Sequence, residues 1–227
     1  RDVAPSRGLG DVYKRQTLKL LSGILYPTSG EVLVNGFVPW ERKNEFKRSF
    51  AIVMGQKNQL WWDLPASDSL YLNKCIYDVD DREYKKTVDE LSELLGVREL
   101  MNIQVRRLSL GERMKMEILA ALIHRPGILF LDEPTIGLDI VSQQKIRDFL
   151  HYYNEQTKTT IILTSHYMRD IEALCSRAVI INSGTLVYDG ALSDINHRMG
   201  DKRLLTLSFS SPVENGKLSV FGRVREN

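Results

Sequence analysis

The sequence predicts an α/β fold with a parallel sheet core and an inserted α-helical subdomain. Apolar runs typical of buried strands occur at residues 50–55, 127–132 and 159–164, and helical periodicity separates the last two. Between the first two strands, about residues 57–126 have mostly helical periodicity. Strands that alternate with helices favour a parallel sheet, and the long helical block indicates an insertion into it.

The composition is that of a globular protein. The 227 residues suffice for one large domain or a core with a subdomain, and 43% of them are hydrophobic. A net charge of +2 gives no electrostatic indication of nucleic-acid binding, and no apolar run approaches the ~18 residues of a membrane span. The two cysteines lie far apart and are expected to be reduced thiols. We therefore expect a cytosolic protein with no nucleic-acid partner.

The first sixteen residues differ from the rest of the chain. Residues 1–16 contain Gly and Pro breakers and many charges, without a helical or strand period. An apolar helical pattern begins at Thr17, and residues 27–30 end it. Residues 31–36 have the pattern of a short strand that ends in a turn. We therefore expect the main domain to begin at Thr17.

The remaining elements follow in the order that such a sheet requires. The helices each have one apolar face, and the strands among them are mostly apolar. The run Asn182-Ser183-Gly184 indicates a hairpin, and the pattern weakens into a polar extension beyond Gly190. In chain order we expect a strand at 50–55, helices at 69–77, 81–95 and from 109, a strand at 127–132, a helix, a strand at 159–164, a helix at 167–176, and hairpin strands at 178–181 and 185–188.

Two adjacent carboxylates, Asp132 and Glu133, end the buried strand at 127–132. Side chains alternate along a strand, so the two leave its end in different directions. Open α/β sheets bind ligands at the carboxyl ends of their strands, and carboxylates in that place suggest chemistry with a metal ion and water. Taken alone, however, Asp-Glu-Pro is equally consistent with an acidic turn.

Further polar residues occupy similar places. Gln56 and His166 each follow a predicted strand, where a solvated glutamine and a packing histidine are the ordinary alternatives. The run Ser109-Leu110-Gly111-Glu112 begins a helix and contains Ser-x-x-Glu, which is the pattern of a capping box. A helix N-terminus with free N–H groups also binds anions, so both interpretations hold together. Asp139 precedes a helix, where an N-cap is the alternative.

Taken in order, Gln56, residues 109–112, Asp132-Glu133, Asp139 and His166 make the chain resemble the nucleotide-binding subunit of an ABC transporter. The resemblance runs from Thr17 to about Gly190. It implies a P-loop NTPase-type (RecA-like) core, ATP and Mg²⁺ as cofactors, and ATP hydrolysis that powers export through separate membrane subunits. It divides the chain into a non-family segment 1–16, an ATPase domain 17–190 with its helical subdomain at about 57–126, and a C-terminal extension 191–227.

The resemblance also implies a role for each of these residues. Asp132 corresponds to the aspartate that holds Mg²⁺, and Glu133 to the catalytic glutamate that orients the attacking water. Gln56 corresponds to a glutamine that contacts both Mg²⁺ and water, and His166 to a histidine that contacts the γ-phosphate. The implied nucleotide-binding residues are Ser109, Leu110, Gly111 and Glu112, which match the signature LSGGQ with Leu110 and Glu112 as departures, and Asp139 at the dimer interface.

The implied partners are a second nucleotide-binding subunit and transmembrane permease subunits. Two adjacent tryptophans cannot both point inward from one strand, so of Trp61 and Trp62 one is expected to pack. The other covers the surface or docks a membrane partner, because exposed aromatic residues favour interfaces. Residues 54–65 also resemble the ABC-2 type exporter branch. The implied location is peripheral, at the cytoplasmic face of the membrane, in a bacterial-type system.

The main departure from the family is its phosphate loop, G-x-x-x-x-G-K-[ST], which belongs just ahead of Thr17. Gly8 and Lys14 have the right separation, but Tyr13 replaces the second Gly and Arg15 replaces the Ser/Thr. A tyrosine side chain obstructs the close approach of the backbone to phosphate, and Arg15 offers Mg²⁺ no hydroxyl. We therefore expect residues 1–16 to be foreign to the family. Two alternative functions are a degenerate, non-hydrolysing partner subunit and a soluble ABC ATPase that is not a transporter.

Overall fold

The structure, a computed structural model, describes residues 9–55 and 59–199. The chain divides into two units, Arg1–Leu192 and Ser193–Asn227. Helix α8 (Leu192–Met199) supplies the described part of the second unit, where the sequence pattern indicated only a polar extension. The first unit contains all the other helices and strands of the described residues.

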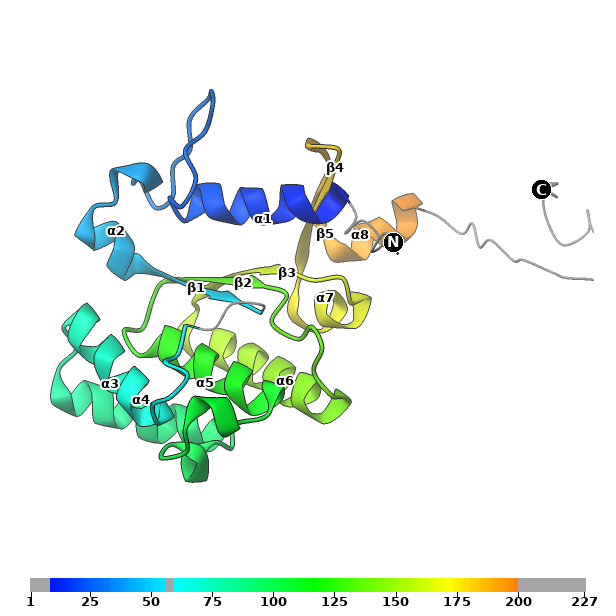
Figure 1. The fold of residues 1–227 in the computed structure, drawn as a ribbon. Coiled ribbons are helices and arrows are strands. Elements are labelled where there is room, and N and C mark those ends of the chain that lie inside the picture. The colour runs from blue at the N-terminus through cyan, green and yellow to red at the C-terminus, as the bar shows by residue number, and fades with distance from the viewer. Residues whose placement is uncertain (1–8, 56–58, 200–227) are drawn as a thin grey trace, which may run out of the picture. The chain divides into compact units, whose positions relative to one another are not determined.

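A parallel sheet of three strands forms the centre of the first unit, in the order β1 (Phe50–Met54), β2 (Ile128–Asp132) and β3 (Thr160–Thr164) (Figure 1). The central strand β2 is buried along its whole length, as its apolar run predicts. In the register of the sheet, Asp132 lies between Met54 and Thr164. The carboxyl ends of the three strands therefore meet at one edge, with Asp132 in the middle.

The outer strand β3 is less buried than its apolar sequence predicts. Thr160 is exposed, and the rest of the strand is half-buried. Within the described residues β3 pairs with β2 alone, so its other edge has no neighbouring strand to cover it. The prediction of a fully buried strand at 159–164 was therefore wrong in its degree of burial, although the strand itself is present.

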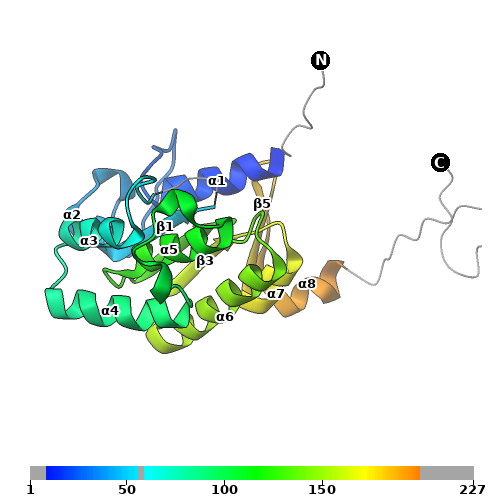
Figure 2. The same ribbon diagram turned by 60° about the horizontal axis from the view of Figure 1, so that its bottom comes forward.

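Helices cover both faces of the sheet (Figure 1). Helix α1 (Leu9–Leu21) crosses one face, where Leu18, Phe46 and Phe130 belong to a small apolar core. Figure 2 brings forward the helices of the opposite face, which bury the larger core. These helices are α3 (Ala66–Tyr77), α4 (Asp81–Leu94), α5 (Leu110–Leu122) and α6 (Ile140–Thr157). Because α3, α4 and α5 all lie between β1 and β2 in the chain, they form the insertion that the sequence predicts.

Shorter elements complete the fold. The predicted hairpin is present, and Ser183 and Gly184 form its turn with positive φ angles of 49° and 79°. Within the described part of the chain, no helix combines the length and the apolar character that crossing a membrane requires. The remaining elements are the 3₁₀ helices η1 (Pro39–Glu41), η2 (Arg98–Leu100) and η3 (Val105–Arg107), the helices α2 (Asn44–Ser49) and α7 (Met168–Leu174), and the hairpin strands β4 (Arg177–Asn182) and β5 (Thr185–Ala191).

Residues 31–36 do not form the predicted strand. A single bridge joins Val34 to Phe37 around a turn in which Asn35 and Gly36 have positive φ angles. A strand requires a partner for its backbone N–H and C=O groups, and no strand of the described residues lies beside this segment. Val32 and Val34 instead pack on the small core, whereas Leu33 between them is exposed.

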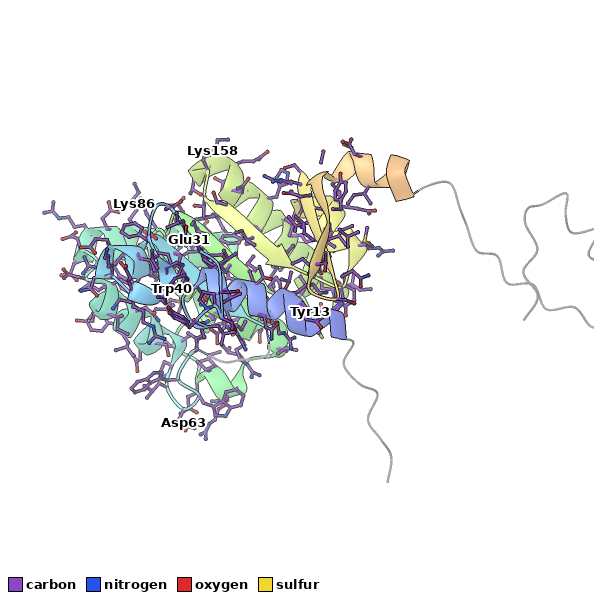
Figure 3. The ribbon with its side chains drawn as sticks, turned by 90° about the horizontal axis from the view of Figure 1, so that it is seen from above. Tyr13, Glu31, Trp40, Asp63, Lys86 and Lys158 are labelled. Carbon is purple, nitrogen blue, oxygen red and sulfur yellow. The ribbon has the colours of Figure 1, made fainter. Side chains whose placement is uncertain are left out.

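Helix α1 begins at Leu9, well before the predicted start at Thr17. After Gly10 this stretch holds Lys14, Arg15 and Gln16, which favour helix by propensity although they give no apolar period. The ring of Tyr13 packs beside Gly184 of the hairpin turn, 3.6 Å from the position that a Cβ would take there (Figure 3). The stretch that the phosphate loop would occupy is therefore helical and packed.

Candidate functional site

Asp132 is buried at the end of β2, and both of its carboxylate oxygens are engaged. Oδ1 accepts a hydrogen bond from Thr164 Oγ1 at 2.7 Å, and Oδ2 accepts one from Arg15 Nε at 2.9 Å. Thr164 comes from the end of β3, and Arg15 comes from α1. Parallel pairing of β2 with β3 thus positions the partner of Oδ1, and helix α1 positions the partner of Oδ2.

Glu133 turns the chain directly after β2. Its φ angle is +53°, which residues other than glycine rarely adopt. Residues with such a backbone conformation cluster at functional sites. The N–H of Glu133 donates to the Thr164 carbonyl at 3.0 Å, which holds this conformation. Glu133 Oε1 lies 3.0 Å from His166 Nε2 and 3.2 Å from Arg15 Nη2. Strands β2 and β3 therefore bring the two predicted catalytic residues, Glu133 and His166, into contact.

Glu133 and His166 both line a small cavity. The side chain of His166 is 42% exposed, and that of Glu133 is buried. Solvent can therefore reach the pair from the histidine side. The cavity has a volume of about 100 Å³ and is lined by Glu133, Thr135, Ile136, Ser165, His166 and Tyr167.

Gly55, directly after β1, has no side chain and so leaves space for the backbone turn at Glu133. A Cβ at residue 55 would lie 2.3 Å from the Glu133 carbonyl oxygen, which is far inside contact distance. The N–H of Gly55 donates to the Asp132 carbonyl at 2.9 Å, so the backbones of the two strand ends lie against each other. Sequence analysis did not single out Gly55, because this close approach depends on the pairing of β1 with β2.

We expect Gly55→Ala to lower the free energy of unfolding by about 1–3 kcal/mol, since the added methyl group forces the backbone of Glu133 to move. Urea denaturation followed by circular dichroism measures this. Gly127→Ala is the matched control, because a Cβ at residue 127 would make an ordinary contact of 3.7 Å with the Ser49 carbonyl oxygen. Equal stability of the two variants would contradict the role of Gly55.

Arg15 is the residue that sequence analysis did not place in the site. Its guanidinium group makes ion pairs with both Asp132 and Glu133, at 2.9 and 3.2 Å. The sequence suggested only that Arg15 lacks the hydroxyl of a phosphate loop. The ion pairs depend on α1 continuing upstream of Thr17, because that helical turn aims the side chain at the end of β2.

The residues present do not fit Mg²⁺ and ATP in the way that the resemblance implies. The guanidinium of Arg15 lies on both carboxylates, where the resemblance places the metal ion. The backbone N–H groups from Tyr13 to Thr17 lie inside α1, where helical hydrogen bonds use them, so they do not surround a phosphate group. Among the residues that the structure describes, no cluster of three or more His, Cys, Asp or Glu side chains forms a metal site.

The signature residues form a second group at the start of α5. Ser109 Oγ accepts the Glu112 N–H at 3.3 Å, and the Glu112 carboxylate accepts the Ser109 N–H at 2.8 Å, which completes the predicted capping box. The hydrogen bond from the Ser109 backbone lowers the pKa of Glu112 below its usual range. The carboxylate of Glu112 is therefore turned back onto its own helix.

Asp139 caps α6 beside that group. Its Oδ1 accepts the Ser142 N–H at 2.9 Å and its Oδ2 accepts the Ser142 hydroxyl at 2.6 Å, and these bonds lower the pKa of Asp139. The starts of α5 and α6 pack closely at Gly111, since a Cβ at residue 111 would lie only 2.3 Å from Ser142 Oγ. The structure therefore brings residues 109–112 and Asp139 together. Gln56 lies outside the described residues.

Comparisons with known proteins lead to the same family as the motifs. The family model described as ABC transporter matches residues 14–136. The chain is 34% identical to the ABC transporter ATP-binding protein NatA of Bacillus subtilis, over 80% of this chain and 74% of NatA. It is 33% identical to the linearmycin resistance ATP-binding protein LnrL of the same organism, over 87% of this chain and 63% of LnrL.

A solved structure of an ATP-binding subunit of an ABC transporter has a TM-score of 0.72 to this chain, with 25% identity over 82% of this chain and 77% of the other. The predicted α/β fold of the P-loop NTPase type is thereby confirmed. Domains of this family bind nucleotide and typically hydrolyse ATP. The chain belongs to the family of ABC transporter ATP-binding proteins.

Proposed function

We propose that this protein is the ATP-hydrolysing subunit of an ABC transporter that powers export through separate membrane subunits of the ABC-2 type. The contact of 3.0 Å between Glu133 and His166, beside the buried Asp132, carries the proposal. Phosphoryl transfer depends on positioned groups and charge rather than on covalent chemistry, and these residues are fixed by two paired strands. A relative that is named for linearmycin resistance supports export. The protein then works peripherally, at the cytoplasmic face of a bacterial-type membrane.

The proposed roles follow the family motif that each residue matches. Once a phosphate loop replaces the stretch that carries Arg15, Asp132 is assigned to Mg²⁺, Glu133 to the attacking water, and His166 to the γ-phosphate. Gln56 is assigned to both metal and water. The signature residues and Asp139 are assigned to the nucleotide of a second copy or a related subunit. These residues lie at the starts of α5 and α6 and form a group separate from the contacts of Glu133. This position supports the assignment, because the N-termini of helices favour anions.

The proposed activity requires a phosphate loop. We assign residues 1–16 as foreign to the family, residues 17–190 as the ATPase domain and residues 191–227 as an extension. A loop-restored version is the same chain with the segment ahead of Thr17 replaced by the first strands and the G-x-x-x-x-G-K-[ST] loop of the family. Phosphate release from Mg²⁺–ATP at roughly 1 s⁻¹ or faster is expected for this version. A folded loop-restored protein without hydrolysis would instead favour the degenerate partner subunit.

We propose that the membrane partner docks on a patch formed by Trp61 and Trp62. Both side chains are exposed, by 56% and 43%, although one of them was expected to pack. The guanidinium carbon of Arg113 lies 4.4 Å from the centre of the Trp62 ring. The backbone N–H of Trp61 donates to Ser69 Oγ at 3.0 Å. Asp63, the next residue, lies at the edge of the first unit in Figure 3. Exposed aromatic side chains on an ordered backbone favour an interface.

Helix α5 anchors this patch. Glu117 is buried, and its Oε1 accepts the N–H groups of Gln59 at 2.7 Å and Leu60 at 3.2 Å. Burial raises the pKa of Glu117. Arg113, one turn earlier on the same helix, stacks on Trp62. The helix that begins at the signature therefore also holds the patch.

Replacing Trp61 and Trp62 together by Ala is expected to abolish co-purification of the loop-restored protein with the membrane subunits encoded beside it. Basal ATPase is expected to stay within about twofold, because the patch does not contact Glu133 or His166. Tyr152→Ala is the control, since Tyr152 is an aromatic residue of α6 with the same exposure as Trp62, 43%. Unchanged co-purification of the double variant would rule the patch out.

A further inference from the structure

A buried polar cluster joins the chain segments that carry Glu133 and His166. Its centre is Asp170 of α7, which has no solvent exposure. Asp170 Oδ2 accepts hydrogen bonds from the Thr135 hydroxyl and, at 3.0 Å, from Ser165 Oγ. Thr135 lies in the turn after Glu133, and Ser165 directly precedes His166.

The cluster is closed by an ion pair. Arg147 of α6 donates from Nη1 to Asp170 Oδ1 at 2.8 Å and from Nη2 to Gln144 Oε1 at 2.9 Å. A buried carboxylate is costly unless its oxygens are paired, and here both oxygens have donors. A fully satisfied buried network favours one arrangement of its members. The cluster therefore holds the turn, the segment before His166 and helix α6 in fixed relation.

Ser165 also holds the backbone on the far side of His166. Its hydroxyl oxygen accepts the Tyr167 N–H at 3.0 Å while the same hydroxyl group donates to Asp170. The backbone is thus held on both sides of His166. On the other strand end, Thr135 ties down the turn whose first residue is Glu133.

We propose that Asp170 is a positioning residue for the Glu133–His166 pair. Through Thr135 it sets the turn that aims Glu133, and through Ser165 it sets the backbone that aims His166. The separation of 3.0 Å between Glu133 Oε1 and His166 Nε2 then depends on a carboxylate that bonds to Thr135 and Ser165. The inference rests on the proposed function, in which this pair serves ATP hydrolysis.

Nitrogen-15 NMR of the imidazole rings tests the positioning in the full chain, without nucleotide. Glu133→Gln identifies the His166 resonance by shifting its Nε2 signal. Asp170→Asn is expected to move that signal toward its position in Glu133→Gln, because the close contact of His166 Nε2 with Glu133 is weakened. An unchanged His166 signal in a folded Asp170→Asn variant would overturn the proposal.

A second pair of variants separates hydrogen bonding from folding. Thr135→Val keeps the shape of the side chain and removes its hydroxyl, so it is expected to shift the His166 signal as Asp170→Asn does. Thr135→Ser keeps the hydroxyl and is expected to retain the wild-type signal. This pair decides the question if Asp170→Asn fails to fold, and equal signals in the Val and Ser variants would overturn the proposal.

Two controls exclude a general loss of stability. Asp189→Asn removes an ion pair with Arg177, 2.7 Å long, from the exposed hairpin. Leu91→Ala removes apolar contacts from the buried core at α4. Both variants are expected to keep the wild-type His166 signal, whereas a shift in either would attribute the effect of Asp170→Asn to destabilisation and overturn the proposal.

The loop-restored version gives the activity readout. Asp170→Asn and Thr135→Val are expected to lower kcat by about 10- to 100-fold with KM for ATP nearly unchanged, as misplaced groups do. An equal kcat for the variants and the parent would overturn the positioning role. If the parent itself does not hydrolyse ATP, the proposed function fails, while a shifted His166 signal still supports positioning by Asp170.

Discussion

Titration of the chain with Mg²⁺–ATP is expected to give no binding at micromolar concentrations. A phosphate loop surrounds the β- and γ-phosphates with N–H groups at a helix N-terminus, and its lysine neutralises charge. Here α1 runs from Leu9 to Leu21 through that place, and Arg15 lies on Asp132 and Glu133. Each lost charge-assisted contact costs about 1.5–3 kcal/mol, and each 1.4 kcal/mol is roughly tenfold in affinity. Binding should therefore be weaker by several orders of magnitude.

Isothermal titration calorimetry of the chain beside its loop-restored version measures this difference. Arg15→Ser is the matched variant, because it removes the ion pairs of Arg15 with both carboxylates and leaves the rest of α1 in place. We expect Arg15→Ser to bind ATP as poorly as the parent, since the helical backbone still lacks free N–H groups. Micromolar binding by the unmodified chain would mean that the residues ahead of Thr17 form a working phosphate site.

Glu133→Gln in the loop-restored version is expected to lower the rate of ATP hydrolysis by roughly 10²- to 10⁴-fold while nucleotide binding is retained. Glutamine has the shape of glutamate, so the turn with its φ angle of +53° and the contact with His166 can persist. The amide lacks the charge that polarises the attacking water. Phosphate release measures turnover, and fluorescent nucleotide titration measures binding.

Glu155→Gln is the control for this substitution. Glu155 is an exposed residue of α6, and its Oε2 lies 3.6 Å from His151 Nδ1. Normal turnover is expected for Glu155→Gln. Near-normal hydrolysis by Glu133→Gln would defeat the assignment of Glu133 as the catalytic glutamate.

The sequence predicted the part of the site that depends on local pattern. The apolar run of β2 is buried at every position, so Asp132 and Glu133 had to emerge at its end. The meeting of Glu133 with His166 depends on the pairing of β2 with β3, for which the family topology was the guide. The spacing of Ser109 and Glu112 indicated a capping box, and an N-cap was the alternative interpretation of Asp139; both are present.

The remaining contacts join residues that are far apart in the chain. Arg15 and Asp132 are 117 positions apart, and Thr135 and Asp170 are 35 apart. No periodicity links such pairs, because they form only once α1 crosses the sheet and α7 packs behind the turn. Residues 31–36 show the reverse case, since their short apolar run before a turn predicted a strand and no neighbouring strand of the described chain pairs with them.

Helix α5 holds the patch formed by Trp61 and Trp62, and a helix of this length is stiff. A helix of 13 residues is about 20 Å long and behaves as a rod. Arg113 and Glu117 attach the patch along the first part of this rod, and Ser109 stands at its tip. We therefore expect a force applied at Trp62 to be transmitted along α5 to its start at Ser109. Because Gly111 abuts Ser142, we expect the same force to reach the start of α6.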